Sequence, residues 1–142
     1  MAGVTLKQLI THVIYREKAM EVSKAEFEIL NAIWAEYPCT AKDVVDRLNQ
    51  QDSWHEKTVK TLLGRLVKKQ AISFEKRSRH YLYQPLIDKN EYIIKESDNF
   101  LKRLFGGKVS PLVASFAKSE KLSQNDVDEL KKIISDWEQS ND

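Results

Sequence analysis

Positively charged side chains are concentrated in one stretch of this 142-residue sequence, between Trp54 and Tyr83. The stretch holds eight lysines and arginines against Glu56 and Glu75, whereas the rest of the chain holds fifteen basic residues against nineteen acidic ones. The formal net charge of +2 therefore combines a local +6 with a remainder of −4. Clustered ammonium and guanidinium groups attract phosphate, so this asymmetry indicates a surface that binds a polyanion. A lysine-rich helix face can also be merely solvated. The arrangement of the elements that carry the charges distinguishes the two interpretations.

Three predicted helices lead up to and through the basic stretch. Residues 23–36 and 40–49 each show apolar side chains at helical spacing, and Ser23 and Thr40 stand where they can cap the two helices. A third helix is expected to begin near Glu56. Its apolar positions recur at i, i+3, i+4, i+7 and i+8, at Val59, Leu62, Leu63, Leu66 and Val67.

The opposite face of the third helix is small, polar and cationic. It gathers Lys57, Thr58, Lys60, Thr61, Gly64, Arg65 and Lys68. A glycine inside an exposed helix costs roughly 1 kcal/mol relative to alanine. Gly64 is therefore either a tolerated loss or a point where the backbone of a partner comes close. Trp54, just before this helix, is expected to pack against its start, with base stacking as the alternative.

Two short strands are expected after the third helix. Apolar and polar residues alternate over residues 72–77 and again over residues 80–84, which predicts a hairpin with Lys76, Arg77 and Arg79 at its basic tip. Three helices followed by a hairpin form the layout of a winged helix-turn-helix, in a mainly α fold with a small β-hairpin. The third helix would enter the major groove of DNA, and the hairpin would lie along phosphate.

The chain after Pro85 is expected to contain helices only. Residues 88–105 form the first, which Gly106-Gly107 ends; Ser110-Pro111 starts the second and Ser123 the last. These helices carry more apolar surface than one copy can bury, which predicts a symmetric homodimer. The residues expected at its interface are Ile94, Leu101, Leu104, Phe105, Leu112, Phe116, Leu130, Ile133, Ile134 and Trp137.

The predicted domains are residues 21–86 for DNA binding and residues 87–142 for dimerisation. Residues 1–20 form an extension of uncertain role: either a helix, with Thr5 and Gln8 placed like a capping box, or a segment that precedes a natural start near Met20. No apolar run approaches the roughly 18 residues needed to span a bilayer, and no secretory signal is expected. The single cysteine, Cys39, fits a reducing cytoplasm and is expected to be a small buried residue.

The sequence offers no sign of an enzyme or of a cofactor. His12, His55 and His80 fall on three different predicted elements, so no metal site is expected, and no nucleophile, zinc or phosphate-loop motif is present. The alternative to DNA binding is a winged helix that serves as a protein-interaction module. Such a module would bind its partner without the salt and sequence dependence of a DNA complex.

Five segments, in this order, resemble the penicillinase-repressor family over about Val22 to Trp137. They are EFEILNAIW (26–34), TAKDVVDRL (40–48), WHEKTVKTLLGRLVKKQAI (54–72), SDNFLKRLFGG (97–107) and LSQNDVDELKKII (122–134). No single segment is a strict signature, but the five are jointly specific. The resemblance implies a dimeric transcriptional repressor on a pseudo-palindromic operator. It places Lys57, Thr58, Lys60, Thr61 and Arg65 where the recognition helix of the family faces DNA.

The resemblance also implies a switch. In the β-lactam branch of the family, a membrane sensor metalloprotease triggers cleavage at an Asn-Phe bond, and Asn99-Phe100 stands at the matching place. The alternative is that Phe100 is a core residue and Asn99 a solvated one. The copper-responsive branch carries Cys-x-Cys pairs near its C-terminus, whereas this chain ends in DWEQSND, so thiolate metal sensing is not expected. Residues 1–20 fall outside the family pattern.

Overall fold

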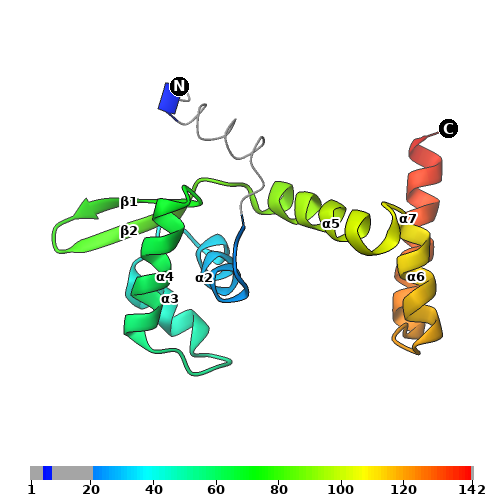
Figure 1. Cartoon of the computed structure of the whole chain (residues 1–142), viewed down its shortest axis with the longest axis horizontal. Helices are drawn as coiled ribbons and strands as arrows, with labels where there is room; N and C mark the ends of the chain where they lie inside the picture. Colours follow the sequence, from blue (N-terminus) through cyan, green and yellow to red (C-terminus); the bar gives the residue numbers. More distant parts are fainter. Residues whose placement is uncertain (1–4, 8–20, 142) are drawn as a thin grey trace. The chain divides into compact units, whose positions relative to one another are not determined.

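The computed structural model describes residues 5–7 and 21–141 of the chain. The chain divides into two compact units, Met1–Tyr92 and Ile93–Asp142 (Figure 1). The elements in order are α2 (Lys24–Ala35), α3 (Ala41–Leu48), α4 (Glu56–Lys68), β1 (Ile72–Arg77), β2 (His80–Pro85), α5 (Lys89–Phe105), α6 (Val109–Lys118) and α7 (Gln124–Ser140). The possible helix before Met20 and its Thr5–Gln8 capping box depend on residues outside the described ones.

Capping boxes start α2 and α3, at the two residues that the sequence predicts as caps. The Ser23 hydroxyl accepts from the Glu26 N–H at 3.1 Å, and the Glu26 carboxylate accepts from the Ser23 N–H at 3.3 Å. Thr40 and Asp43 make the same pair of bonds at 3.1 and 2.9 Å. Each box satisfies two N–H groups that the first turn of a helix leaves without a partner. Local sequence therefore defines where α2 and α3 begin.

The core of unit one lies between α2, α3, α4 and the base of the hairpin. Each helix turns one apolar stripe inward, and burial of each large side chain contributes roughly 1.5–3 kcal/mol. The largest fully buried side chains are Ile29, Leu30, Ile33, Cys39, Val44, Val59, Leu63, Leu66 and Ile72. Each predicted apolar stripe therefore faces the core, and its members that are only partly buried pack against it: Phe27, Trp34, Val45, Leu48 and Val67.

The predicted hairpin is confirmed, with β2 extending one residue further, to Pro85. The strands pair antiparallel from Ile72↔Pro85 to Arg77↔His80, which leaves a two-residue turn. A third strand-like segment joins the hairpin at Cys39, whose N–H donates to the Tyr83 carbonyl at 3.0 Å and whose carbonyl accepts from the Tyr83 N–H at 2.7 Å. The base of the hairpin is thus attached to the segment between α2 and α3.

Cys39 is 1% exposed, as expected for a small buried residue. Burial raises the pKa of its thiol, and the nearby Arg47 guanidinium offsets this effect only in part. The side chain therefore remains a neutral thiol near neutral pH and serves packing.

The first turn of α5 belongs to unit one. The Trp34 indole N–H donates to the Ile87 carbonyl at 3.1 Å. The Tyr92 ring lies 5.9 Å from the Phe27 ring and 5.7 Å from the Trp34 ring, centre to centre. These aromatic contacts hold the segment that leaves the hairpin against α2.

Unit two consists of the rest of α5 with α6 and α7. Gly106 and Gly107 follow α5 at φ values of 58° and 79°, as expected of a glycine helix stop. Ser123 caps α7 in a box with Asp126, both bonds being 3.0 Å long. The predicted start of α6 is wrong by two residues: the helix begins at Val109 and not at Pro111, so the Ser110-Pro111 pair lies inside its first turn. Proline fits there because the N–H groups of a first turn need no helical acceptor.

Candidate nucleic-acid interface

The predicted division of α4 into a buried and an exposed face is confirmed. Val59, Leu63 and Leu66 are fully buried. Every polar or cationic side chain predicted for the other face is exposed, namely Lys57, Thr58, Lys60, Thr61, Arg65 and Lys68. The Thr61 hydroxyl donates to the Lys57 carbonyl at 3.0 Å, within the helix. Thr61 can therefore offer a partner its methyl group and the lone pairs of its oxygen.

Gly64 lies in the middle of this exposed face. A Cβ built on it would meet nothing within 4 Å. The packing of unit one therefore does not require a glycine here. A molecule that lies on this face could approach the α4 backbone more closely at Gly64 than it could over a side chain.

The start of α4 is set by Trp54, which packs against the core as predicted. Its backbone N–H donates to the Asn49 side-chain oxygen at 2.6 Å. His55 precedes the helix without a side-chain capping bond. Glu56 occupies the first helical position, where a carboxylate is favoured by the helix dipole, and pairs with Lys60 at 3.3 Å.

The end of α4 is held by a partly buried ion pair that sequence reasoning missed. The Lys69 ammonium group donates to the Glu26 carboxylate at 2.8 Å and to the Glu21 carbonyl at 2.7 Å. Glu26 is 4% exposed. Burial alone would raise the pKa of Glu26, but hydrogen bonds from Lys69 and Ser23, with the charge of Lys69, lower it. The signal in the sequence was Glu26 itself, because a carboxylate on the buried side of α2 needs a cationic partner.

The hairpin exposes the three cationic side chains expected at its tip, Lys76, Arg77 and Arg79. The Arg77 guanidinium lies 3.4 Å from the Glu75 carboxylate, so part of its charge is balanced within β1. Phe74 and Tyr81, each 45% exposed, pack ring to ring at 4.6 Å across the two strands. The hairpin therefore offers cations together with an exposed aromatic pair.

A groove of about 840 Å³ lies between the start of α3, the start of α4 and the hairpin. It brings together three of the residues predicted to bind DNA: Lys60, Lys76 and Arg79. The other six are not among its lining residues: Lys57, Thr58, Thr61, Arg65 and Lys68 lie on the exposed face of α4, and Arg77 lies on β1.

The groove also contains residues that sequence reasoning did not assign to the interface. Lys42 contributes a further ammonium group from the first turn of α3. His80 and Tyr81 contribute from β2, and the carboxylates of Asp46 and Glu56 oppose the cations. The sequence could have assigned Lys42 to the interface only through its position in the helix that precedes α4. Ammonium and guanidinium groups on several walls suit a phosphate backbone that passes between helix and hairpin.

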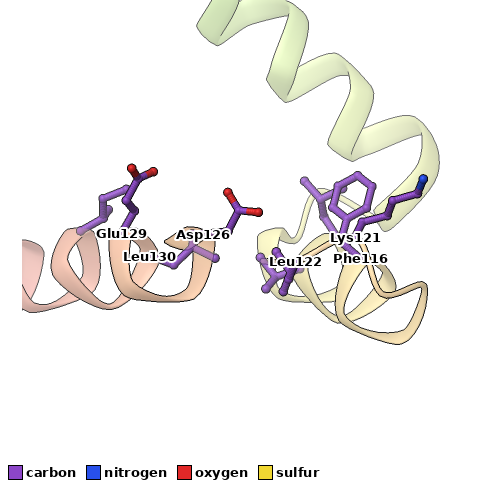
Figure 2. A pocket seen from close by; sticks show the side chains of 9 residues that line it. Phe116, Lys121, Leu122, Asp126, Glu129 and Leu130 are labelled. Atoms are coloured by element: carbon purple, nitrogen blue, oxygen red, sulfur yellow. The ribbon is translucent and has the colours of Figure 1, made fainter. Parts of the chain in front are cut away.

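The apolar residues predicted for a dimer interface lie in unit two, and none of them is buried in a single chain. Ile94, Ile133 and Trp137 are 68%, 63% and 65% exposed. A hollow of about 400 Å³ lies between α6 and α7 (Figure 2). Its lining is mainly apolar, with the charged side chains of Lys121, Asp126 and Glu129, and includes Leu112, Val113, Phe116, Leu122, Leu130 and Ile133.

Within residues 5–7 and 21–141, no group of three or more His, Cys, Asp and Glu side chains is placed to hold a metal ion. None of the helices in these residues is long and apolar enough to cross a membrane.

Comparison with known proteins assigns the chain to a family. The model of the penicillinase repressor family matches residues 22–136. The methicillin resistance regulatory protein MecI of Staphylococcus aureus (strain N315) is 33% identical over 117 residues, which cover 82% of this chain and 95% of that protein. The penicillinase repressor of Bacillus licheniformis is 33% identical over 118 residues, which cover 83% of this chain and 92% of that protein.

Among solved structures, the DNA-binding domain of the repressor BlaI is 35% identical, with a TM-score of 0.48. The match covers 53% of this chain and 92% of the BlaI chain. The match of the family model over most of the sequence, together with the identity to MecI and to the penicillinase repressor, shows that the chain belongs to the penicillinase-repressor family of DNA-binding transcriptional repressors, which are not enzymes.

Proposed function

We propose that the protein is a dimeric transcriptional repressor that binds a pseudo-palindromic operator in the cytoplasm. Residues 21–86 bind DNA and residues 87–142 join two copies. The observation that carries the proposal is the exposed cationic face of α4 beside a groove whose cations come from α3, α4 and the hairpin. Cations from three elements around one groove are expected of a surface that binds a DNA duplex, whereas a merely solvated helix face would carry its cations on one element.

In the proposed complex, the exposed face of α4 lies in the major groove. Lys57, Lys60 and Arg65 can donate to guanine edges or phosphate, and the methyl groups of Thr58 and Thr61 can contact thymine methyls. Gly64 leaves room for close approach of the duplex. Lys68 lies at the far end of the same face, and the hairpin cations Lys76, Arg77 and Arg79 contact phosphate without reading sequence.

The occupant proposed for the apolar surface of unit two is a second copy of this chain. Neither α6 nor α7 has a buried residue in the single chain, so their apolar side chains have no core of their own. An isologous interface would cover them on both copies at once. Two recognition helices must then reach successive major grooves, which sets the half-sites roughly one helical turn apart.

Fluorescence anisotropy tests the DNA-binding proposal. The full chain is titrated with a duplex selected from a randomised library and with a scrambled duplex of the same length and composition, at several salt concentrations. Affinity should fall steeply with salt, because each neutralised phosphate adds about −0.9 to the slope of log affinity against log salt. A flat slope, with equal affinity for both duplexes, would reject the repressor and favour the protein-interaction module.

We also propose that cleavage between Asn99 and Phe100 inactivates the repressor, triggered by a membrane sensor metalloprotease. Both residues lie in α5 and are exposed, Phe100 by 38%. The Lys102–Asp98 ion pair, 2.8 Å long, spans the bond. Helical backbone must open before a protease can bind it, so cleavage depends on local unfolding of α5. The cut would separate residues 1–99 from most of the dimerising part and remove avidity.

Incubation with an induced cognate sensor, followed by mass spectrometry, tests this switch. The expected products are residues 1–99 and 100–142. Asp98→Ala removes the ion pair that spans the bond, so this variant should be cut faster if opening of α5 limits the rate. Intact chain after incubation with an active sensor would show that control runs by another route.

A further inference from the structure

Glu56 places a negative charge inside the cationic groove. It lines the groove together with Lys60, Lys76 and Arg79. Its carboxylate lies 3.3 Å from the Lys60 ammonium group, one helical turn away. The side chains of Glu56 and Lys60 are 64% and 61% exposed, so the pair is open to exchange with groups of a bound molecule.

On DNA, the Glu56 carboxylate can meet either a phosphate group or the edge of a base. Phosphate repels it, and a phosphate that recruits Lys60 must first take that ammonium group away from Glu56. A base edge with an amino group, the N4 of cytosine or the N6 of adenine, can instead donate a hydrogen bond to it. Glu56 is the first residue of α4, and the N-terminal residues of a recognition helix are those that contact base edges.

We infer that Glu56 is a specificity-determining residue that weakens binding to every duplex except those that present an amino donor to the start of α4. The inference rests on the proposed function, in which α4 lies in the major groove. Non-specific complexes depend almost entirely on phosphate contacts, so repulsion by the Glu56 carboxylate lowers their affinity in full. In an operator that supplies the amino donor, the hydrogen bond to the carboxylate offsets this loss of affinity. The ratio of operator to non-specific affinity is therefore larger with Glu56 than without it.

Glu56→Gln is the variant that tests the inference, since glutamine keeps the size of the side chain and removes its charge. With the selected and scrambled duplexes, affinity for scrambled DNA should rise about threefold to tenfold, while operator affinity changes less than twofold. The salt slope for scrambled DNA should steepen by about one, because Lys60 becomes free to neutralise a phosphate. Glu56→Ala should reproduce the fall in the affinity ratio.

Glu75→Gln is the matched control. Glu75 is the other carboxylate between Trp54 and Tyr83, is exposed, and pairs with Arg77 at 3.4 Å, but it is not a lining residue of the groove. This variant has the same change in net charge and should leave the affinity ratio within twofold of wild type. A ratio lowered as much as by Glu56→Gln would mean that net charge alone acts, and would overturn the inference.

Adding Lys60→Gln identifies the group on which Glu56 acts. In a Lys60→Gln background, Glu56→Gln should raise the affinity for scrambled DNA by less than half of its effect in the wild type. If both duplexes respond equally to Glu56→Gln, or neither responds, Glu56 does not determine specificity. That failure is distinct from failure of the proposed function, in which the wild type itself would show neither sequence preference nor salt dependence.

Discussion

Single residues of the interface divide into those that can contact phosphate and those that can read bases. Arg79 lies in the groove at the hairpin, whereas Thr61 lies on the exposed face of α4. Contacts to phosphate are the same for every sequence, while a threonine methyl distinguishes thymine from the other bases. Removal of either side chain should therefore change the affinities for operator and scrambled DNA in a different way.

Arg79→Ala should lower affinity for operator and scrambled duplexes by a similar factor and reduce the salt slope by about one, because one phosphate contact is lost. Thr61→Ala should lower operator affinity more than scrambled affinity. Anisotropy titrations over a salt series measure both effects. Arg77→Ala is the control on the hairpin, with a smaller expected loss, since Glu75 already balances part of its charge. Unchanged affinities for Arg79→Ala would show that the hairpin does not contact DNA.

Helix α4 is an element held at both ends. Trp54 packs at its start, and Lys69 joins its end to Glu26 of α2. The orientation of the exposed face therefore depends on residues that do not themselves lie on that face. The Glu26–Lys69 pair also links the stability of unit one to pH, because the folded state lowers the pKa of Glu26.

Glu26→Gln should lower the free energy of unfolding at pH 7 by about 1–3 kcal/mol, because it removes a charged hydrogen bond to Lys69. A carboxyl whose pKa is lowered by folding stabilises the protein above its usual value of 4.5 and loses this effect as pH falls through the folded value. The difference between wild type and Glu26→Gln should therefore shrink between pH 7 and pH 3.

Urea unfolding followed by circular dichroism at several pH values measures this difference. Glu28→Gln is the control on the same helix. Glu28 is exposed, and its replacement should change stability by no more than about 0.5 kcal/mol. A constant difference between wild type and Glu26→Gln across the pH range would mean that the ion pair does not respond to acid.

At the scale of the whole molecule, the proposed regulation depends on two copies acting together. One winged helix presents one recognition helix, and the second copy adds affinity because its binding becomes intramolecular once the first has bound. Large apolar side chains of α5, α6 and α7, among them Ile94, Ile133 and Trp137, remain exposed in the single chain, which is why we assign this surface to the proposed interface between copies.

Trp137→Glu should convert the proposed dimer to a monomer and lower operator affinity about 100-fold, because a charge in the proposed apolar interface must be desolvated and avidity is lost. Light scattering after size exclusion gives the mass, and anisotropy gives the affinity. Gln139→Glu adds the same charge two residues further along α7 and should leave both unchanged. A Trp137→Glu protein that stays dimeric would place the interface elsewhere.

Much of the fold could be predicted because its signals are local. The capping boxes at Ser23 and Ser123, the stripe of α4 and the glycines after α5 each act within a few residues, where helical or strand periodicity determines which groups meet. The start of α6 was misplaced because Pro111 fits more than one position in a first turn.

By itself, the sequence determined the elements, their buried faces and the concentration of positive charge in one stretch. Only the tertiary structure decided that Lys69 pairs with Glu26, that Cys39 pairs with Tyr83, and that Lys42 joins Lys60 and Arg79 in one groove. These partners are many residues apart, and no periodicity links them. They meet because burial of the shared core folds the helices and the hairpin together, so contact geometry, and not local pattern, determines the site.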